Sequence, residues 1–218
     1  MATRTYGQYC GVALALDIVG ERWTMLILRE VLLGPRRFSD LLDALPGLST
    51  GLLTARLRAL ESEGLLRRRR LAPPAASAVY ELTDAGRELE PVVLGLARFG
   101  GERLGPRDED LAFRPQWAML AIRANHDPDA AQGVEAVYQF DIGDDAFHVI
   151  VHDGTLEVHD GSTRAPVVRV VSDPDTFARV ASDPGSAPLD QLRVEGSRQD
   201  VRLMLRIISP SRRPKPAP

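Results

Sequence analysis

The chain has 218 residues, 44% of them hydrophobic, and a formal net charge of −3 at pH 7. It contains no run of about 18 apolar residues, so no membrane span is expected. Its single cysteine excludes an internal disulfide. No basic segment followed by an apolar run opens the sequence, so no secretion signal is expected and the predicted location is the cytoplasm.

The charge is unevenly distributed along the chain. Residues 1–104 contain 14 Arg and 12 acidic residues, whereas residues 105–218 contain 13 basic and 18 acidic residues. Four arginines are consecutive at positions 67–70. Phosphate contacts need local positive charge, so the negative total does not exclude a nucleic-acid partner.

The first predicted helix, residues 11–19, is apolar enough to be buried in a contact. A second apolar helix follows over residues 22–28, and Trp23 within it is interpreted as a core residue. The first helix is expected to form a dimer seam together with a later helix over residues 88–100. The predicted dimerisation residues are Val12, Leu16, Leu96 and Phe99.

Two short helices joined by a tight turn are predicted next. Residues 36–45 end at Pro46-Gly47, and a second helix begins after Ser49 and ends at Gly64. A serine at the first position can accept a hydrogen bond from free amides of the first turn, and glycine suits the left-handed residue that ends a helix. Leu53, Leu57 and Leu60 form the inward stripe. Two helices so arranged are typical of a helix-turn-helix, whose second helix enters the major groove.

A basic hairpin follows this pair of helices. The arginine run begins one strand, residues 79–83 alternate as a second strand, and residues 72–77 form a tip of small residues. By itself an arginine run is more often a solvated surface, but the preceding helices favour a wing that contacts DNA. The predicted DNA-binding residues are Arg37, Ser49, Thr50, Gly51, Thr54, Ala55, Arg58, Arg68, Arg69, Arg70 and Ser77.

The second half has a different pattern. A Gly-rich linker over residues 100–110 precedes a helix at 115–123. Alternating segments then predict strands, separated by Gly143-Asp144, Asp153-Gly154 and Asp160-Gly161 turns. The expected strands are residues 134–142, 146–152, 155–159, 166–171 and 192–196, with helices starting near residues 172 and 197.

The first half resembles the HxlR family of bacterial transcriptional regulators, relatives of the MarR group. The resemblance covers residues 9–100 and includes Ala15–Arg29, Gly34–Leu41, Leu45–Ser49, Leu53–Glu61 and Tyr80–Thr83. It implies a homodimeric winged-helix regulator, here expected to be a repressor, that binds a palindromic operator in double-stranded DNA. Gly11 departs from the family pattern, which has Pro after the N-terminal Cys, and Phe99 stands where the family has Trp.

The second half resembles the sterol carrier protein type 2 domain through Asp153-Gly154, Val168–Phe177 and Val194–Asp200. The resemblance implies a curved sheet backed by helices around an apolar tunnel. We expect a hydrophobic small-molecule effector there that changes operator affinity, although a filled core or a dimerisation module is an equal alternative. The predicted ligand-binding residues are Trp117, Met119, Leu120, Tyr138, Phe140, Phe147, Val149, Leu156, Phe177 and Leu192, with Tyr138, His148 and Arg169 as polar candidates.

The expected fold class is therefore α+β, with an N-terminal winged helix-turn-helix and a C-terminal α/β sterol-carrier-like domain built on a curved antiparallel or mixed sheet. The expected domains are 1–104 for DNA binding and dimerisation, 105–210 for the ligand and 211–218 as a disordered tail.

Neither catalysis, a cofactor nor a metal site is expected. His148, His152 and His159 are the nearest approach to a metal cluster, and a solvent-facing sheet surface explains them better. Two alternative functions remain: a redox-responsive regulator acting through Cys10, with the second half as a structural accessory, and a non-catalytic lipid carrier. No Lys or His lies near Cys10 in sequence, so no lowered thiol pKa is expected from its neighbours.

Overall fold

The computed structural model describes residues 5–72, 77–105, 108, 110–182 and 191–208. The chain divides into two compact units, Met1–Val93 and Leu94–Pro218, and the division falls inside helix α6. The expected wing tip at residues 73–76 and the expected tail at 211–218 lie outside the described residues. Every helix among the described residues is too short or too polar to cross a lipid bilayer.

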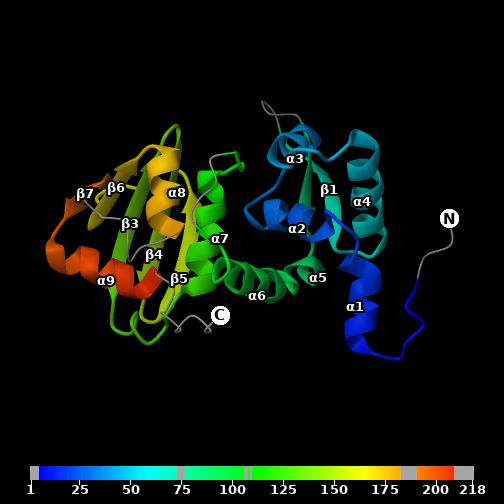
Figure 1. The fold of residues 1–218 in the computed structure, drawn as a ribbon, viewed down its shortest axis with the longest axis horizontal. Coiled ribbons are helices and arrows are strands. Elements are labelled where there is room, and N and C mark those ends of the chain that lie inside the picture. Colours follow the sequence, from blue (N-terminus) through cyan, green and yellow to red (C-terminus); the bar gives the residue numbers. More distant parts are fainter. Residues whose placement is uncertain (1–4, 73–76, 106–107, 109, 183–190, 209–218) are drawn as a thin grey trace. The chain divides into compact units, whose positions relative to one another are not determined.

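The first unit consists of short helices and a two-stranded hairpin (Figure 1). Its elements are α1 (Gly11–Val19), α2 (Thr24–Leu32), α3 (Phe38–Ala44), α4 (Thr50–Ser62), β1 (Leu66–Arg70), β2 (Ala78–Leu82), α5 (Asp84–Arg87) and the start of α6 (Glu90–Gly101). The helix predicted over 88–100 forms as α6, and the short helix α5 that precedes it was not predicted.

Helix α4 forms where its sequence pattern predicts. The Ser49 hydroxyl accepts a hydrogen bond from the Leu52 amide, and Gly64 ends the helix with a φ of 69°, which the absence of a Cβ permits. Leu53, Leu57 and Leu60 are fully buried in a core that includes Ile27, Leu28 and Leu41. Burial of this leucine stripe leaves the opposite side of α4 free of packing.

The hairpin is joined to the helical core by its backbone. Strands β1 and β2 pair antiparallel, with Arg67 opposite Glu81 and Arg68 opposite Tyr80. A further bridge joins Arg36 to Tyr80 through two backbone hydrogen bonds of 3.0 and 2.7 Å. The segment between α2 and α3 therefore extends the wing by one more short strand-like pairing.

Trp23 differs from the prediction that places it inside a helix. It precedes α2 and adopts a left-handed conformation with φ of 78°, which is uncommon for a bulky residue. Its ring packs partly buried against the leucine core, close to Gly47, where an added Cβ would lie 3.8 Å from the ring. The interpretation of Trp23 as a core-packing residue holds, while its helical placement was wrong.

The second unit is a sheet covered on one face by helices (Figure 1). Within the described residues the strand order is β5-β4-β3-β6-β7, with β3 and β6 parallel and the other neighbours antiparallel. The sheet is thus mixed, as one of the predicted alternatives. Its elements are α7 (Pro115–Asn125), β3 (Glu135–Ile142), β4 (Asp145–His152), β5 (Thr155–Asp160), β6 (Val168–Ser172), α8 (Pro174–Ser182), β7 (Arg193–Gly196) and α9 (Arg198–Ile208).

Aromatic residues fill much of the space between the sheet and its helices. The rings of Phe140 and Phe147 stack across β3 and β4 with centroids 4.8 Å apart. Phe177 of α8 meets Phe140 edge-on at 6.2 Å, a favourable geometry for aromatic pairs. Because successive residues of a strand point to opposite faces, the other face carries Gln139, Asp141 and their cross-strand partners.

Candidate nucleic-acid interface

The outward side of α4 presents small and polar residues. Ser49, Thr50, Gly51, Ala55 and Arg58 are exposed, and Thr54 is half-buried. An added Cβ at Gly51 would meet only open space, so the backbone of the first turn is accessible. The N-terminus of a helix carries partial positive charge and free amides, which suit a phosphate.

Some of the polar atoms on this side are already engaged. The Thr54 hydroxyl donates a 2.8 Å hydrogen bond to the Thr50 carbonyl, a common use of threonine inside a helix. The Ser49 oxygen accepts from Leu52, while its proton remains available for donation. The Ser49 hydroxyl can therefore donate to a phosphate, whereas the Thr54 hydroxyl, in this hydrogen bond, can only accept.

Two arginines of α4 have different surroundings. Arg56 donates a 2.7 Å hydrogen bond to the Glu21 carboxylate and another to the Arg22 carbonyl, so it links α4 to the turn before α2. Arg58 is exposed and forms no ion pair with any described residue. Arg58 is thus the α4 cation that is free to reach a base or a phosphate.

Glu81 divides the four wing arginines into two classes, and sequence reasoning missed it. Its nearly buried carboxylate accepts 2.8 Å hydrogen bonds from both Arg69 and Arg67. Arg69, and to a lesser extent Arg67, hold the pKa of Glu81 below its usual range. Period-two alternation places Glu81, Arg67 and Arg69 on one face of the hairpin, and that alternation was the signal available in the sequence.

Arg68 and Arg70 lie on the other face of β1. Leu66, on the same face, is buried in the core, whereas Arg68 and Arg70 farther along the strand are both exposed. Neither forms an ion pair within the part of the chain that the structure describes. Of the predicted backbone-contacting arginines, Arg68 and Arg70 are therefore unpaired, whereas Arg69 is held by Glu81.

The remaining predicted DNA contacts differ in accessibility. Arg37 is exposed at the start of α3, where its amide donates to the Asp40 carboxylate over 2.9 Å. The Ser77 hydroxyl oxygen is buried and has no hydrogen-bond partner among the described residues. Arg37 is therefore available to an external partner, and the Ser77 hydroxyl faces the protein.

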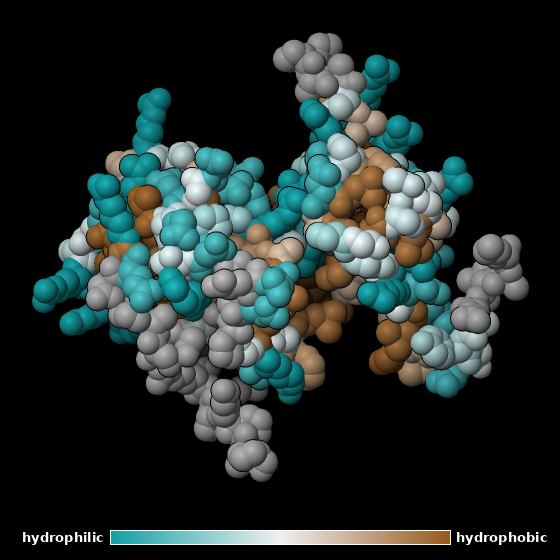
Figure 2. Space-filling view, turned by 45° about the horizontal axis from the view of Figure 1, so that its top comes forward, coloured by the Kyte–Doolittle hydropathy of each residue, from teal (hydrophilic) through white to brown (hydrophobic). Residues whose placement is uncertain are grey.

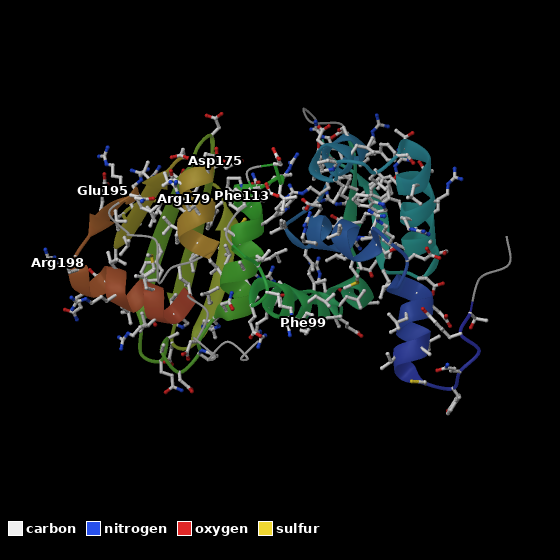
Figure 3. All side chains as sticks on the ribbon, in the orientation of Figure 1. Phe99, Phe113, Asp175, Arg179, Glu195 and Arg198 are labelled. Carbon is white, nitrogen blue, oxygen red and sulfur yellow. The ribbon has the colours of Figure 1, made fainter. Side chains whose placement is uncertain are left out.

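Large apolar side chains are exposed on α1 and α6. Val12 and Leu16 of α1 are 70% and 44% exposed, and Leu96 and Phe99 of α6 are 52% and 60% exposed. Figure 2 shows hydrophobic surface over α1, and Figure 3 shows Phe99 projecting from α6. Two exposed apolar helix faces of this kind suit contact with another protein surface.

Cys10 lies exposed immediately before α1. The backbone amides of Ala13 and Val12 lower the pKa of its thiol, although neither makes a regular capping hydrogen bond to sulfur. The expectation of no lowered pKa was wrong, because it considered charged neighbours in sequence and not the amides at the start of a helix.

The predicted ligand-binding residues lie mostly in the apolar interior of the second unit. The buried members are Met119, Leu120, Tyr138, Phe140, Phe147, Val149 and Phe177, whereas Trp117, Leu156 and Leu192 are half-buried. His148 and Arg169 pair with Gln139 across the sheet. They lie on the face opposite Tyr138, so the three polar candidates do not share one side of the sheet.

Tyr138 is an unsatisfied polar group in this core. Its side chain is fully buried, and its hydroxyl has no hydrogen-bond partner among the described residues. Burial, and then the charge of Asp200, raise the pKa of Tyr138. A buried hydroxyl without a partner is costly, so this atom is available to an acceptor that enters from outside.

The histidines on the open face of the sheet form polar pairs. His148 stacks on His159 with ring centroids 5.3 Å apart, while His152 contacts Glu135. No group of three His, Cys, Asp or Glu side chains among the described residues is arranged to hold a metal ion.

Comparisons with known proteins agree on the first half of the chain. The HxlR-like helix-turn-helix family matches residues 18–108. The HTH-type transcriptional regulator sll1512 of Synechocystis sp. is 40% identical over 98 residues, covering 45% of this chain and 73% of that protein. The HTH-type regulator YvaP of Bacillus subtilis is 37% identical, covering 42% of this chain and 85% of its own length.

A solved structure of the redox regulator HypR in its oxidised form is 31% identical, with a TM-score of 0.41, covering 45% of this chain and 99% of that one. The sequence matches and the helix-turn-helix and wing described above concern the same residues. The chain therefore belongs to the HxlR-like helix-turn-helix family and is a transcriptional regulator of that type.

Proposed function

We propose that this protein is a homodimeric repressor that binds a palindromic operator through α4 and the wing. The observation that carries the proposal is the division of its arginines. Arg56, Arg67 and Arg69 are held by carboxylates, whereas Arg58, Arg68 and Arg70 are exposed without such partners among the described residues. In this proposal Arg58 reads the major groove and the two wing arginines contact the phosphate backbone.

The proposed dimer uses the exposed apolar faces of α1 and α6. A palindrome is read by two recognition helices about 34 Å apart, so each protomer needs a partner that fixes this spacing. Val12, Leu16, Leu96 and Phe99 supply apolar area that is otherwise left in water. Light scattering at micromolar concentration should give the mass of a dimer, and Leu96→Glu with Phe99→Glu should give a monomer.

Operator binding is tested by selection from random duplexes. The wild-type chain should enrich one sequence with two-fold symmetry from a random pool, and Arg58→Ala should weaken binding to it by about 1–3 kcal/mol. In cells, the wild type should repress a reporter gene whose promoter overlaps that sequence, and Arg58→Ala should leave the reporter expressed. Enrichment of no sequence would refute the proposal.

We further propose that the second unit is a sterol-carrier-like sensor whose hydrophobic ligand alters operator affinity. The sheet with helices on one face supports this, as does the unpartnered Tyr138 hydroxyl within an apolar core. Such pockets combine apolar walls with few polar groups. A ligand with one acceptor and an apolar body would have to displace the packed rings of Phe140, Phe147 and Phe177.

The sensor proposal has a direct test in the full-length chain. A fluorescent fatty-acid probe should bind with a Kd that rises in Tyr138→Phe, and saturating probe should change operator affinity by about 5- to 150-fold. Binding of the probe without any change in operator affinity would make the second unit a carrier or a structural accessory instead.

The surroundings of Cys10 favour a second candidate, a redox-responsive regulator. The thiol is exposed and its pKa is lowered by the amides that begin α1, and thiolate is the reactive form. Diamide should then weaken operator binding by the wild type and leave Cys10→Ser unchanged. An equal response of both proteins would refute this role.

A further inference from the structure

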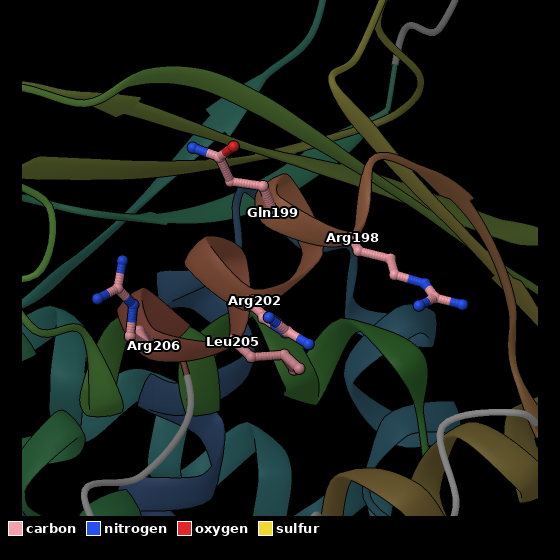
Figure 4. A pocket seen from close by; sticks show the side chains of 5 residues that line it. All are labelled: Arg198, Gln199, Arg202, Leu205 and Arg206. Carbon is pink, nitrogen blue, oxygen red and sulfur yellow. The ribbon is translucent and has the colours of Figure 1, made fainter.

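Helix α9 carries a row of arginines on its outer face. Arg198, Arg202 and Arg206 follow one another at intervals of four residues and are all exposed. With Gln199 and Leu205 they line a shallow surface hollow. Figure 4 shows Arg198 and Arg206 pointing to opposite sides of this hollow, with Arg202 and Leu205 between them. We call these three arginines the α9 stripe.

The opposite face of α9 fixes the stripe in place. Met204 and Ile207 are buried, and the backbone carbonyl of Ile207 accepts a 2.9 Å hydrogen bond from the Asp127 amide. The helix start is capped by Ser197, whose hydroxyl donates to the Asp200 carboxylate over 2.6 Å and accepts from the Asp200 amide. The one carboxylate of α9 is therefore engaged in the cap.

No carboxylate in the described part of the chain forms an ion pair with the stripe. No ion pair or hydrogen bond joins the three guanidinium groups to another described residue. The chain that precedes α9 is rich in acids, since residues 105–197 contain 17 acidic and 7 basic residues. The lack of an ion pair to the stripe is therefore unexpected. Like charges four residues apart on a helix repel each other, so an anionic partner would relieve a repulsion that the fold leaves in place.

We propose that the α9 stripe contacts the phosphate backbone of DNA that flanks the operator. This inference rests on the proposed function, because it requires DNA already bound through α4 and the wing. Covalent attachment then keeps the stripe at a high effective concentration near the duplex. The three arginines rise about 6 Å per step and span about 12 Å along the helix axis, and a duplex presents one negative charge per about 1.7 Å of its axis.

The shape of the stripe favours a polyanion over other anionic partners. A single phosphate or carboxylate cannot reach guanidinium groups that diverge along about 12 Å of helix. An interfacial membrane helix needs exposed large apolar residues beside its basic face, whereas Leu205 of α9 is half-buried between arginines. A nucleic-acid backbone instead requires only spaced positive charge, which guanidinium supplies.

The test compares two duplexes and two charge-reduced variants of the full-length chain. One duplex is a 20-bp core (roughly two helical turns) selected by the wild type; the other extends it by about 15 bp of fixed sequence on each side. Arg198→Gln, Arg202→Gln and Arg206→Gln are combined in the stripe variant. The control, Arg164→Gln with Arg193→Gln, removes exposed positive charge elsewhere in the second unit. Thermal unfolding verifies that both variants fold.

The wild type and the control should bind the extended duplex more tightly than the core, with a steeper salt dependence. The stripe variant should bind the core normally and lose the gain from the flanks, with a salt slope lower by about 0.9 for each lost phosphate contact, or about 2.7 per protomer. Replacing Arg198, Arg202 and Arg206 with Lys conserves their charge and should keep most of the extra affinity for the extended duplex.

Four results would overturn the inference. An equal flanking gain in the stripe variant, or no gain in the wild type, refutes the stripe while leaving core binding and the proposed function intact. Absence of wild-type binding even to the core refutes the proposed function and the stripe together. A fall in molar mass of the stripe variant by light scattering, with an unchanged flanking gain, would assign the stripe to an acidic protein surface instead.

Discussion

Adjacent arginines of the wing are expected to contribute unequally to DNA binding, because Glu81 holds some of them and not others. Replacing both Arg68 and Arg70 with alanine removes two exposed cations that form no ion pair with any residue the structure describes. Each phosphate contact contributes about 0.9 to the slope of log affinity against log salt. A homodimer that loses four such contacts should therefore show a slope lower by about 3.6.

The measurement is fluorescence anisotropy of the selected operator between about 50 and 200 mM salt, the range over which such contacts matter most. The matched comparison is Arg70→Ala against Arg69→Ala, which remove the same charge from adjacent positions. Arg69 shares the Glu81 carboxylate with Arg67, so its loss leaves that carboxylate with one partner. We expect Arg69→Ala to change the slope by less than half as much as Arg70→Ala. Equal slopes would refute the division of the wing by Glu81.

Three further predictions concern stability. Leu57→Ala, at a side chain 1% exposed in the first core, should lower the free energy of unfolding by about 2–5 kcal/mol in urea titration; a loss below about 1 kcal/mol would contradict the packing. Because the folded pKa of Glu81 is depressed, its stabilising effect is fully present above the ordinary pKa of a glutamate and is lost as pH falls through the folded pKa. Glu81→Gln should flatten this acid-side loss in thermal unfolding, and an unchanged pH profile would contradict it. Tyr138→Phe removes a buried hydroxyl without a partner, so it should leave stability unchanged or raise it by about 1 kcal/mol, and a clear loss would show that the hydroxyl is satisfied.

Much of the first unit was predictable because its determinants are local. The leucines of α4 repeat at helical spacing, Ser49 caps its start and Gly64 ends it in the left-handed conformation, and each of these depends on residues only a few positions away. The strands of the second unit likewise follow period-two alternation and Asp-Gly turns, and they lie within about two residues of their predicted bounds.

Other features depend on contacts between residues distant in sequence. Arg67 and Arg69 are held by Glu81 of the next strand, and Arg56 by Glu21, 35 positions earlier, so a list of arginines could not separate paired from free ones. His148 and Arg169 were grouped with Tyr138 by residue type, whereas the register with Gln139 places them on the other face. The thiol of Cys10 is tuned by helix amides that exist only once α1 forms.

The sequence by itself thus determined which segments become helices and strands and that the first half is a helix-turn-helix with a basic wing. Spacing and capping are properties of neighbouring residues, and they act before any tertiary contact. Only the tertiary structure decided which cations remain free, because the partner of a charge is set by strand register and helix packing. Arg68, Arg70 and the α9 stripe form no ion pair with a described carboxylate, and no local pattern encodes that.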